Sequence, residues 1–164
     1  HIVLGKIISL GITGLLSSAV SFIGILLSLP ALTGISFSLE AYDITAFVLL
    51  LVLIVVTVLL FTSILTIVST LAKSVKEATS YSSVVMILIM FLAMSNFMIS
   101  SPSSNPALYF IPIYNISLSL TGLFSMNYEP LLILITVISN IAYIGLALYL
   151  LTKMFNNEKI IFNK

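Results

Sequence analysis

The side chains that could do chemistry are few in this chain. It has six basic residues, five acidic residues, one histidine and no cysteine. The lack of cysteine excludes disulfides and thiolate metal sites, and a single histidine cannot hold a metal cluster. No Ser-His-Asp arrangement, carboxylate pair or metalloprotease pattern occurs. We therefore expect no catalytic residues, no metal site and no cofactor.

Nucleotide hydrolysis and nucleic-acid binding are not expected either. The one Gly-Lys pair, Gly5-Lys6, lacks the upstream glycine and the following Ser or Thr of a phosphate-binding loop. The formal net charge is +1, which offers nucleic acid no strongly basic surface. The chain should have no ATPase site of its own and no nucleic-acid partner.

One group of charged residues has a spacing that suggests a site. Lys73 and Glu77 are four residues apart, with Lys76 between them, in the segment 71–80. This spacing suits a short surface helix. Two interpretations remain open: a docking element for a cytoplasmic partner, or a solvated loop whose lysines only set the direction of the chain in a membrane.

The composition of the chain is that of a membrane protein. Apolar residues make up 60% and charged residues 7%, and the mean hydropathy is +1.30. Four apolar runs, at about 7–29, 44–70, 81–99 and 131–151, contain no charged side chain. A helix needs about 20 residues to cross a hydrocarbon core, and these continuous runs lack the alternation of barrel strands. We expect an all-α integral membrane protein with four transmembrane helices, in which 1–164 is a single transmembrane domain.

The basic residues predict which way these helices cross. They lie in alternate gaps: Lys6 before the first run, Lys73 and Lys76 between the second and third, and Lys153, Lys159 and Lys164 after the fourth. Because cytoplasmic loops are enriched in basic residues, both termini and the segment 71–80 should be cytoplasmic. The chain opens on His1 instead of Met, so we expect a piece of a longer polypeptide.

The gap at 101–129, on the predicted outer side, holds an apolar stretch too short and too interrupted to cross. Such stretches are typical of re-entrant or interfacial segments, so we expect a short outer helical segment at about 109–125. Pro112 marks its predicted start and Asn115 is its candidate cap, and both are candidate residues of an outer re-entrant gate. An interfacial loop that anchors the last two spans is the alternative. Tyr109, Tyr114 and Tyr128 flank the segment, and together with Tyr42 in the other outer gap they predict an aromatic belt at the outer face.

Small and hydroxyl residues within the runs indicate helix contacts. The first run has a stripe of small side chains that lets helices approach closely: Gly11, Gly14, Ser18, Ser21 and Ser28. This stripe fits either a mobile contact in a transporter or static packing. The second run ends in a hydroxyl cluster: Thr62, Ser63, Thr66, Ser69 and Thr70. These hydroxyls either bond to their own helix or line a wet vestibule.

The third run has methionines four residues apart: Met86, Met90, Met94 and Met98. Flexible thioethers suit a surface that accepts varied apolar partners, so Met90 and Met94 are candidates for a transport pathway or, more simply, for helix packing and lipid contact. Asn96 and Asn140 are the amides within the apolar runs, and we expect them to bond between helices.

Three short motifs, in their order and spacing, resemble the C-terminal half of ABC type-2 transporter permeases, most closely the sodium-efflux NatB-like family. They are KSVKEA from Lys73, followed by Tyr81; IPIYNIS from Ile111; and FNNEKIIF from Phe155. Gly5-Lys6 also stands where that family has a Gly-Lys pair after an inner coupling segment. The likeness extends over essentially the whole chain, but the family's first two spans and its outer domain are absent from these residues.

The resemblance implies a permease in the plasma membrane of a bacterium. A permease of this family has six spans, so the four runs would be spans three to six, and 101–129 would form re-entrant outer helices. Two permease copies, identical or different, would pair with separate ATPase subunits. Gly5, Lys6, Lys73, Lys76 and Glu77 become candidate ATPase-coupling residues.

The function expected from these observations is that of the permease subunit, or a fragment of it, of an ATP-driven exporter. Charge is absent from the runs, which disfavours an ion-coupled carrier, since such carriers need an ionisable group at membrane depth. A non-transporting membrane scaffold or assembly protein remains the main alternative. The cargo is left open among sodium, peptides, drugs and lipids.

Overall fold

The computed structural model describes residues 5, 8–9, 11–20, 23, 44–96, 105–125 and 127–156. All the regular secondary structure in these residues is helical, which confirms the predicted all-α class. The elements are α2 (Ile44–Leu71), α3 (Val75–Ser95), the short 3-10 helix η3 (Pro106–Phe110), α4 (Tyr114–Phe124) and α5 (Pro130–Asn156). Toward the N-terminus, Gly11–Val20 forms a shorter apolar helix.

Three of the helices are long and apolar enough to cross a membrane, namely α2, α3 and the part of α5 from Pro130 to Met154. They correspond to three of the four predicted spans and indicate a multi-pass membrane protein. Long uninterrupted apolar segments become helices because a helix satisfies its own backbone N–H and C=O groups where there is no water. The predicted span at 7–29 is only partly described, by Gly11–Val20 and a few single helical residues.

The structure contradicts the prediction that the segment 71–80 forms a short, separate surface helix. Only residues 72–74 separate α2 from α3, and Val75 already begins the long helix. Ser74 caps that helix: its hydroxyl accepts from the Glu77 backbone N–H at 3.2 Å, and a Glu77 carboxylate oxygen accepts from the Lys73 N–H at 2.9 Å. This exchange is close to a capping box. The prediction was wrong because the Ser-x-x-Glu spacing starts a long helix here and leaves no room for a short one.

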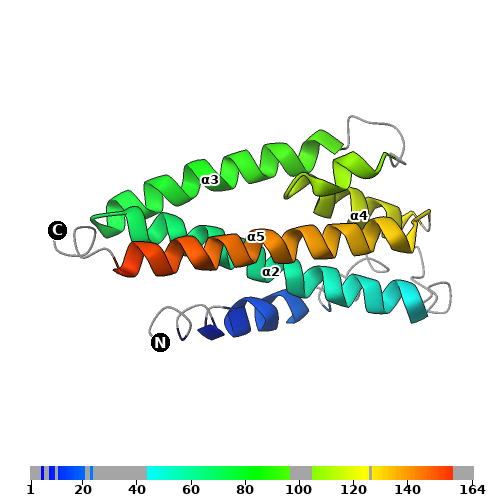
Figure 1. Cartoon of the computed structure of the whole chain (residues 1–164), viewed down its shortest axis with the longest axis horizontal. Helices are drawn as coiled ribbons and strands as arrows, with labels where there is room; N and C mark the ends of the chain where they lie inside the picture. The colour runs from blue at the N-terminus through cyan, green and yellow to red at the C-terminus, as the bar shows by residue number, and fades with distance from the viewer. Residues whose placement is uncertain are drawn as a thin grey trace.

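The long helices alternate in direction (Figure 1). Both α2 and α5 run the same way and pack side by side, while α3 runs the opposite way along them. The core between α2 and α5 is built from the following buried side chains, joined by one residue of α4: Ala46, Leu50, Leu53, Val56, Leu123, Ile133 and Val137. This arrangement leaves α4 between α3 and α5 at one end of the bundle.

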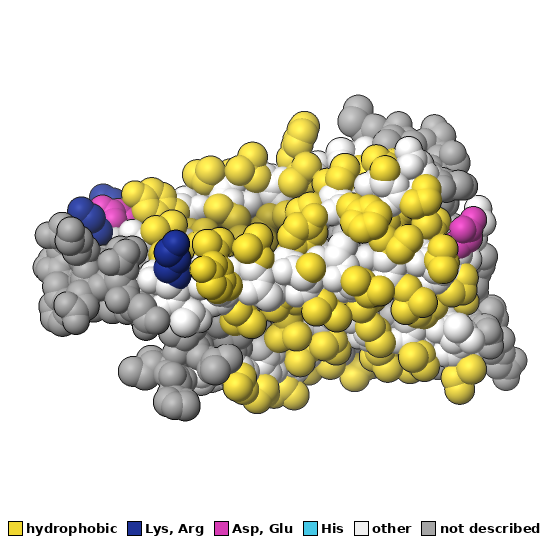
Figure 2. Space-filling view, in the orientation of Figure 1, with side chains coloured by type: hydrophobic (Ala, Val, Ile, Leu, Met, Phe, Trp, Pro, Cys, Tyr) yellow, Lys and Arg dark blue, Asp and Glu magenta, His cyan; other side chains and the backbone are white. Residues whose placement is uncertain are grey.

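Apolar side chains cover the outside of the bundle, and charge is confined to its ends. On the face drawn in Figure 2, hydrophobic side chains form a broad band between basic groups at one end and an acidic group at the other. The described charges are Lys73, Lys76, Glu77 and Lys153 at the end where α2 and α5 finish, and Glu129 at the end where α5 begins. Along α3, Ile89 is the one buried residue. This distribution fits a hydrocarbon environment.

Small residues let the N-terminal helix approach α2 closely, as the predicted stripe requires. A Cβ atom on Gly14 would lie 2.7 Å from Val58 Cγ1, and one on Gly11 would lie 3.2 Å from Leu59 Cδ2. Ser18 bonds to the Leu15 carbonyl of its own helix. The two remaining members of the stripe, at positions 21 and 28, lie outside the described residues.

The hydroxyl cluster of α2 bonds to its own helix. Ser63, Thr66 and Thr70 each donate to the carbonyl four residues earlier, at 2.7 to 2.8 Å. Ser63 and Thr66 are also buried, with exposures of 0% and 3%. Of the two interpretations of this cluster, the self-bonded one is confirmed for these three residues.

Candidate functional site

The most unusual part of the fold is the segment 105–125, which runs along α5 and back. Phe110, at the end of η3, accepts a hydrogen bond through its carbonyl from the Tyr143 hydroxyl at 2.6 Å. On the way back, Ser119 and Thr136 hydroxyls lie 2.8 Å apart. Tyr143 is thirteen residues beyond the start of α5 at Pro130, so the segment reaches roughly 20 Å along that helix at 1.5 Å per residue.

This segment reverses its direction at a tight turn formed by Pro112 and Ile113. The Tyr114 N–H donates to the Pro112 carbonyl at 2.8 Å, and Ile113 between them has φ 71° and ψ −51°. These are close to the angles of the strained classic γ-turn. A β-branched residue is disfavoured in this region of backbone space, so packing around the turn must offset the strain.

The predicted cap of the outer helix is wrong. The helix α4 starts at Tyr114, and Ile113, which precedes it, makes no side-chain cap bond. Asn115 lies inside the first turn with its side chain fully buried. Its polar side chain serves tertiary contacts instead of the helix end, while Pro112 does mark the turn just before the helix.

Asn115 joins η3, α4 and α5. Its amide nitrogen donates to the Tyr109 carbonyl at 3.0 Å and to the Ser139 hydroxyl at 3.1 Å, which uses both of its N–H groups. The Asn140 amide donates to the Asn115 carbonyl oxygen at 3.3 Å. The single Ser139 hydroxyl proton has two acceptors within reach, the Thr136 carbonyl of its own helix at 3.0 Å and the Tyr109 carbonyl at 3.2 Å. We call Tyr109, Asn115, Ser139 and Asn140 the amide cluster.

The amide cluster is buried, and each of its buried side-chain nitrogen and oxygen atoms has a hydrogen-bond partner. Asn115 and Asn140 both have 0% exposure and Ser139 has 7%. Across the described residues, every buried side-chain nitrogen or oxygen has a hydrogen-bond partner. Buried polar groups cost free energy when unpaired, so these hydrogen bonds let the cluster fix the position of the returning segment against α5.

The predicted aromatic belt is wrong for two of its members. Tyr109 and Tyr114 are buried, with exposures of 4% and 7%, and they pack with Leu118 and Leu132 in a second small core. Burial raises the pKa of the Tyr109 phenol above its usual 10.0, and Glu129 and then Tyr114 raise it further. Tyr128 is half-buried, and position 42 lies outside the described residues.

Two hydrogen bonds hold α3 to α4. Asn96 donates from its amide to the Thr121 hydroxyl at 3.0 Å, and the Ser117 hydroxyl donates to the Ala93 carbonyl at 2.8 Å. The expectation that Asn96 and Asn140 bond between helices is thus confirmed. They do not bond to each other, because α4 lies between their helices and supplies the partner of each.

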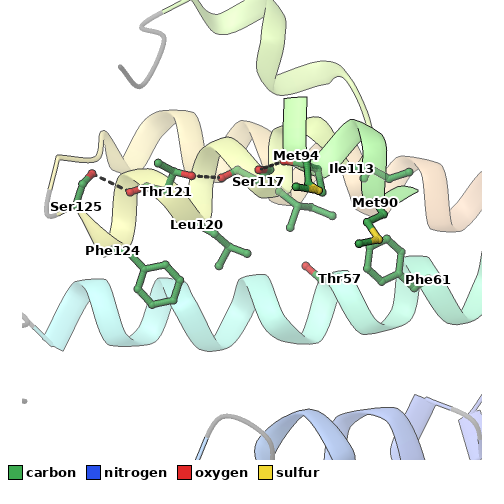
Figure 3. Close-up of a pocket in the computed structure, with 12 residues that line it drawn as sticks. Thr57, Phe61, Met90, Met94, Ile113, Ser117, Leu120, Thr121, Phe124 and Ser125 are labelled. Carbon is green, nitrogen blue, oxygen red and sulfur yellow. Dashed lines mark hydrogen bonds between the residues drawn. The ribbon is translucent and has the colours of Figure 1, made fainter. Parts of the chain in front are cut away.

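A hollow of about 690 Å³ lies among α2, α3 and α4 (Figure 3). Its walls include Thr57 and Phe61 from α2, Met90 and Met94 from α3, and Leu120 and Phe124 from α4. Met90 and Met94 are more than half exposed. The methionine stripe therefore lines a hollow at these two positions, while Met98 lies outside the described residues.

Only some of the candidate ATPase-coupling residues lie together in the structure. Lys73, Lys76 and Glu77 lie together at one end of the bundle, and both lysines are exposed. Glu77 is committed to the start of α3 through its bonds with Lys73 and Ser74. Gly5 is exposed and has open space around it, and Lys6 lies outside the described residues.

Four members of the site were missed from the sequence: Thr136, Ser139, Tyr143 and Ile113. The first three belong to a polar stripe on α5 that also contains Asn140, with steps of three, one and three residues. This stripe within an apolar run was a readable signal for a helix face with polar partners. No feature of the sequence predicted the backbone conformation of Ile113.

The described residues bring together no three His, Asp or Glu side chains as metal ligands. Comparisons of the chain with protein-family models, with curated protein sequences and with solved structures found no match.

Proposed function

We propose that this chain is a permease subunit, or a fragment of one, of an ATP-driven ABC exporter, powered by separate ATPase subunits. The observation that carries the proposal is the path of residues 105–125, which descend along the outer half of α5 and return through α4. A segment with this path is what the resemblance to ABC type-2 permeases implies before the last span. In a membrane it would be re-entrant, with Pro112 at its deepest point.

The membrane direction in this proposal follows from charge. The end that carries Lys73, Lys76 and Lys153 faces the cytoplasm, and the end that carries Glu129 faces outward. The partly described first run then supplies the fourth crossing, with Gly11 and Gly14 packed on α2. The re-entrant segment lies on the outer side, where it can act as a gate above the transport pathway.

The energy for transport comes from a partner in this proposal. No charged side chain lies on α2, on α3 after Glu77, or on α5 before Lys153. An ion-coupled mechanism would need such a group at depth. A second permease copy, identical or related, would cover part of α3, whose apolar side chains are exposed almost all round.

The ATPase subunit would dock on Lys73 and Lys76, next to the turn between α2 and α3. Glu77 is left out of this docking role because its carboxylate and backbone already serve the cap of α3. The decisive experiment is co-purification of a nucleotide-binding subunit with the full-length protein and with a K73A/K76A variant. Lys153→Ala is the matched control, since Lys153 is an exposed lysine near the same end of the bundle.

The expected result is that the double variant loses most of the bound subunit while Lys153→Ala keeps it. Equal binding by all three proteins would remove the docking role of Lys73 and Lys76. If no nucleotide-binding subunit accompanies the unaltered protein, the exporter proposal fails and a scaffold role becomes the better explanation of the exposed α3.

A further inference from the structure

The hollow among α2, α3 and α4 has walls whose hydroxyl groups are already used. Each hydroxyl proton goes to a backbone carbonyl: Thr57 to Leu53 at 2.6 Å, Ser117 to Ala93 at 2.8 Å, Thr121 to Ser117 at 2.9 Å and Ser125 to Thr121 at 2.8 Å. The last three bonds are drawn in Figure 3. A polar ligand inside would find no free hydroxyl donor there, although the hydroxyl oxygens can still accept. With the donors used and the rest of the lining apolar, the hollow favours an apolar guest.

The remaining wall is apolar and adaptable. Phe61, Leu120 and Phe124 supply large apolar surfaces, and Met90 and Met94 supply flexible thioethers that adjust to the shape of an apolar guest. The volume of about 690 Å³ falls within the range of about 300–1,000 Å³ for sites that hold small organic molecules. The guest that fits this lining is a hydrocarbon chain.

The position of the hollow indicates where that chain comes from. Thr57 and Phe61 lie near the middle of α2, and Phe124 lies at the end of α4 close to Glu129. The hollow thus extends from the middle of the apolar band toward the Glu129 end. Phe124 is 52% exposed and Met90 63%, so the hollow opens on the apolar surface of the bundle, where the acyl chains of a bilayer meet it.

We propose that this hollow holds one acyl chain of a bilayer phospholipid, from the leaflet at the Glu129 end. No lysine is found at that end among the described residues, so the walls provide no cation to select an anionic headgroup. A zwitterionic lipid suffices. The chain fills the space between α2 and α3 beside α4, to which Asn96 and Ser117 hold α3.

Tryptophan fluorescence offers a direct test, because the chain contains no tryptophan. Phe61→Trp places a single reporter in the wall, and Phe124→Trp is a second reporter in case the first variant folds poorly. Phe91→Trp is the matched control: Phe91 is on α3, is 74% exposed and does not line the hollow. The full chain is reconstituted in phosphatidylcholine vesicles, with and without bromine atoms on the acyl chains.

A filling variant separates a held chain from ordinary lipid contact. Ala93 lines the hollow, so Ala93→Phe should occupy part of its volume. We expect brominated lipid to quench both wall reporters and the control, and the aqueous quencher acrylamide to quench none of them. Adding Ala93→Phe should remove most of the lipid quenching from the Phe61→Trp and Phe124→Trp reporters while leaving that of Phe91→Trp unchanged.

Three outcomes would overturn the proposal. Quenching of the wall reporters by acrylamide would mean that water fills the hollow. Quenching by neither agent would mean that protein closes it. Lipid quenching that Ala93→Phe does not alter would mean that the reporter only touches bulk lipid. The proposal needs only a bilayer around the bundle, so failure to find an ATPase partner would leave it standing.

Discussion

Asn115 lies where three elements meet, and its amide is shared among them. Both of its N–H groups are donated outside its own helix, to a carbonyl of η3 and a hydroxyl of α5, and its oxygen accepts from Asn140. Because both amides are fully buried, removal of either one would leave polar groups of the other without that partner in the protein interior. The two side chains should therefore act as a unit.

We expect Asn115→Ala and Asn140→Ala each to lower the free energy of unfolding by about 1–3 kcal/mol, since each leaves buried partners unsatisfied. The double variant should cost less than the sum, with a coupling of about 0.6–1.7 kcal/mol. Equilibrium unfolding in mixed micelles measures both. Asn127→Ala, at an exposed asparagine, is the control and should be nearly neutral. Strictly additive effects would show that the two amides do not share an interaction.

Ile113 is the other residue whose behaviour can be predicted from local geometry. Its φ of 71° suits glycine and strains a residue with a Cβ. We expect Ile113→Gly to be more stable than Ile113→Ala by about 1 kcal/mol, the reverse of the order in an ordinary helix. Because both variants lack the isoleucine side chain, the difference between their free energies of unfolding reports the strain of the backbone. If alanine proves as stable as glycine in the same unfolding measurement, Ile113 does not have the positive φ of the γ-turn.

At the scale of elements, packing depends on how closely two helices approach. Lipid tails are as apolar as leucine, so helices in a bilayer associate through close contact and hydrogen bonds more than through burial of apolar surface. Gly11 and Gly14 provide that contact for the N-terminal helix on α2, and the two bonds from Asn96 and Ser117 provide it for α3 on α4.

Gly14→Ala should separate the N-terminal helix from α2, because the new Cβ would lie 2.7 Å from Val58 Cγ1. Overpacking of this kind costs about 1–3 kcal/mol. Gly145→Ala is the matched control on α5, where a Cβ meets nothing within 4 Å, and it should be neutral or stabilising by about 0.5–1 kcal/mol. The measurement is the thermal unfolding temperature of the two variants and of the unaltered protein in the same detergent. Equal losses would contradict the close contact at Gly14.

At the scale of the whole molecule, the bundle has one basic end and one acidic end with an apolar belt between them. Charge is costly at membrane depth, so the belt fixes how the bundle sits in a bilayer. The lysine-rich end then indicates which end of the bundle faces the cytoplasm. The proposed gate and the proposed docking residues lie on opposite sides of the membrane if this direction holds.

Cysteine labelling tests the direction, since the chain has no cysteine of its own. We expect Asn127→Cys to react with a membrane-impermeant maleimide in intact cells, and Lys76→Cys to react only after the cells are opened. Both positions are exposed, so accessibility within the fold does not distinguish them. The opposite pattern would reverse the proposed sidedness and with it the docking and gate assignments. Reaction of both positions from outside would contradict the proposal that the two ends lie on opposite sides of the membrane.

Much of the fold could be predicted from hydrophobic length alone. The runs at 44–70 and 131–151 became α2 and α5 within a few residues of their predicted bounds, because an apolar segment of that length has few alternatives to a helix in lipid. The bonding of Asn96 and Asn140 was predictable for a similar reason, since an amide inside an apolar run must find a partner. The partners themselves were not predictable, because α4 comes between the two helices only in three dimensions.

The sequence by itself determined the helical class, the apolar belt and the separation of charge to the two ends, since these follow from side-chain type and the length of each run. Tertiary structure decided the rest. It turned Asn115 from a cap into a buried tertiary link and moved Tyr109 and Tyr114 from an interface into a core. Each of these depends on which groups lie nearby in space, and a hydrogen bond or a packed ring is decided by distance and direction, which residue type and spacing do not encode.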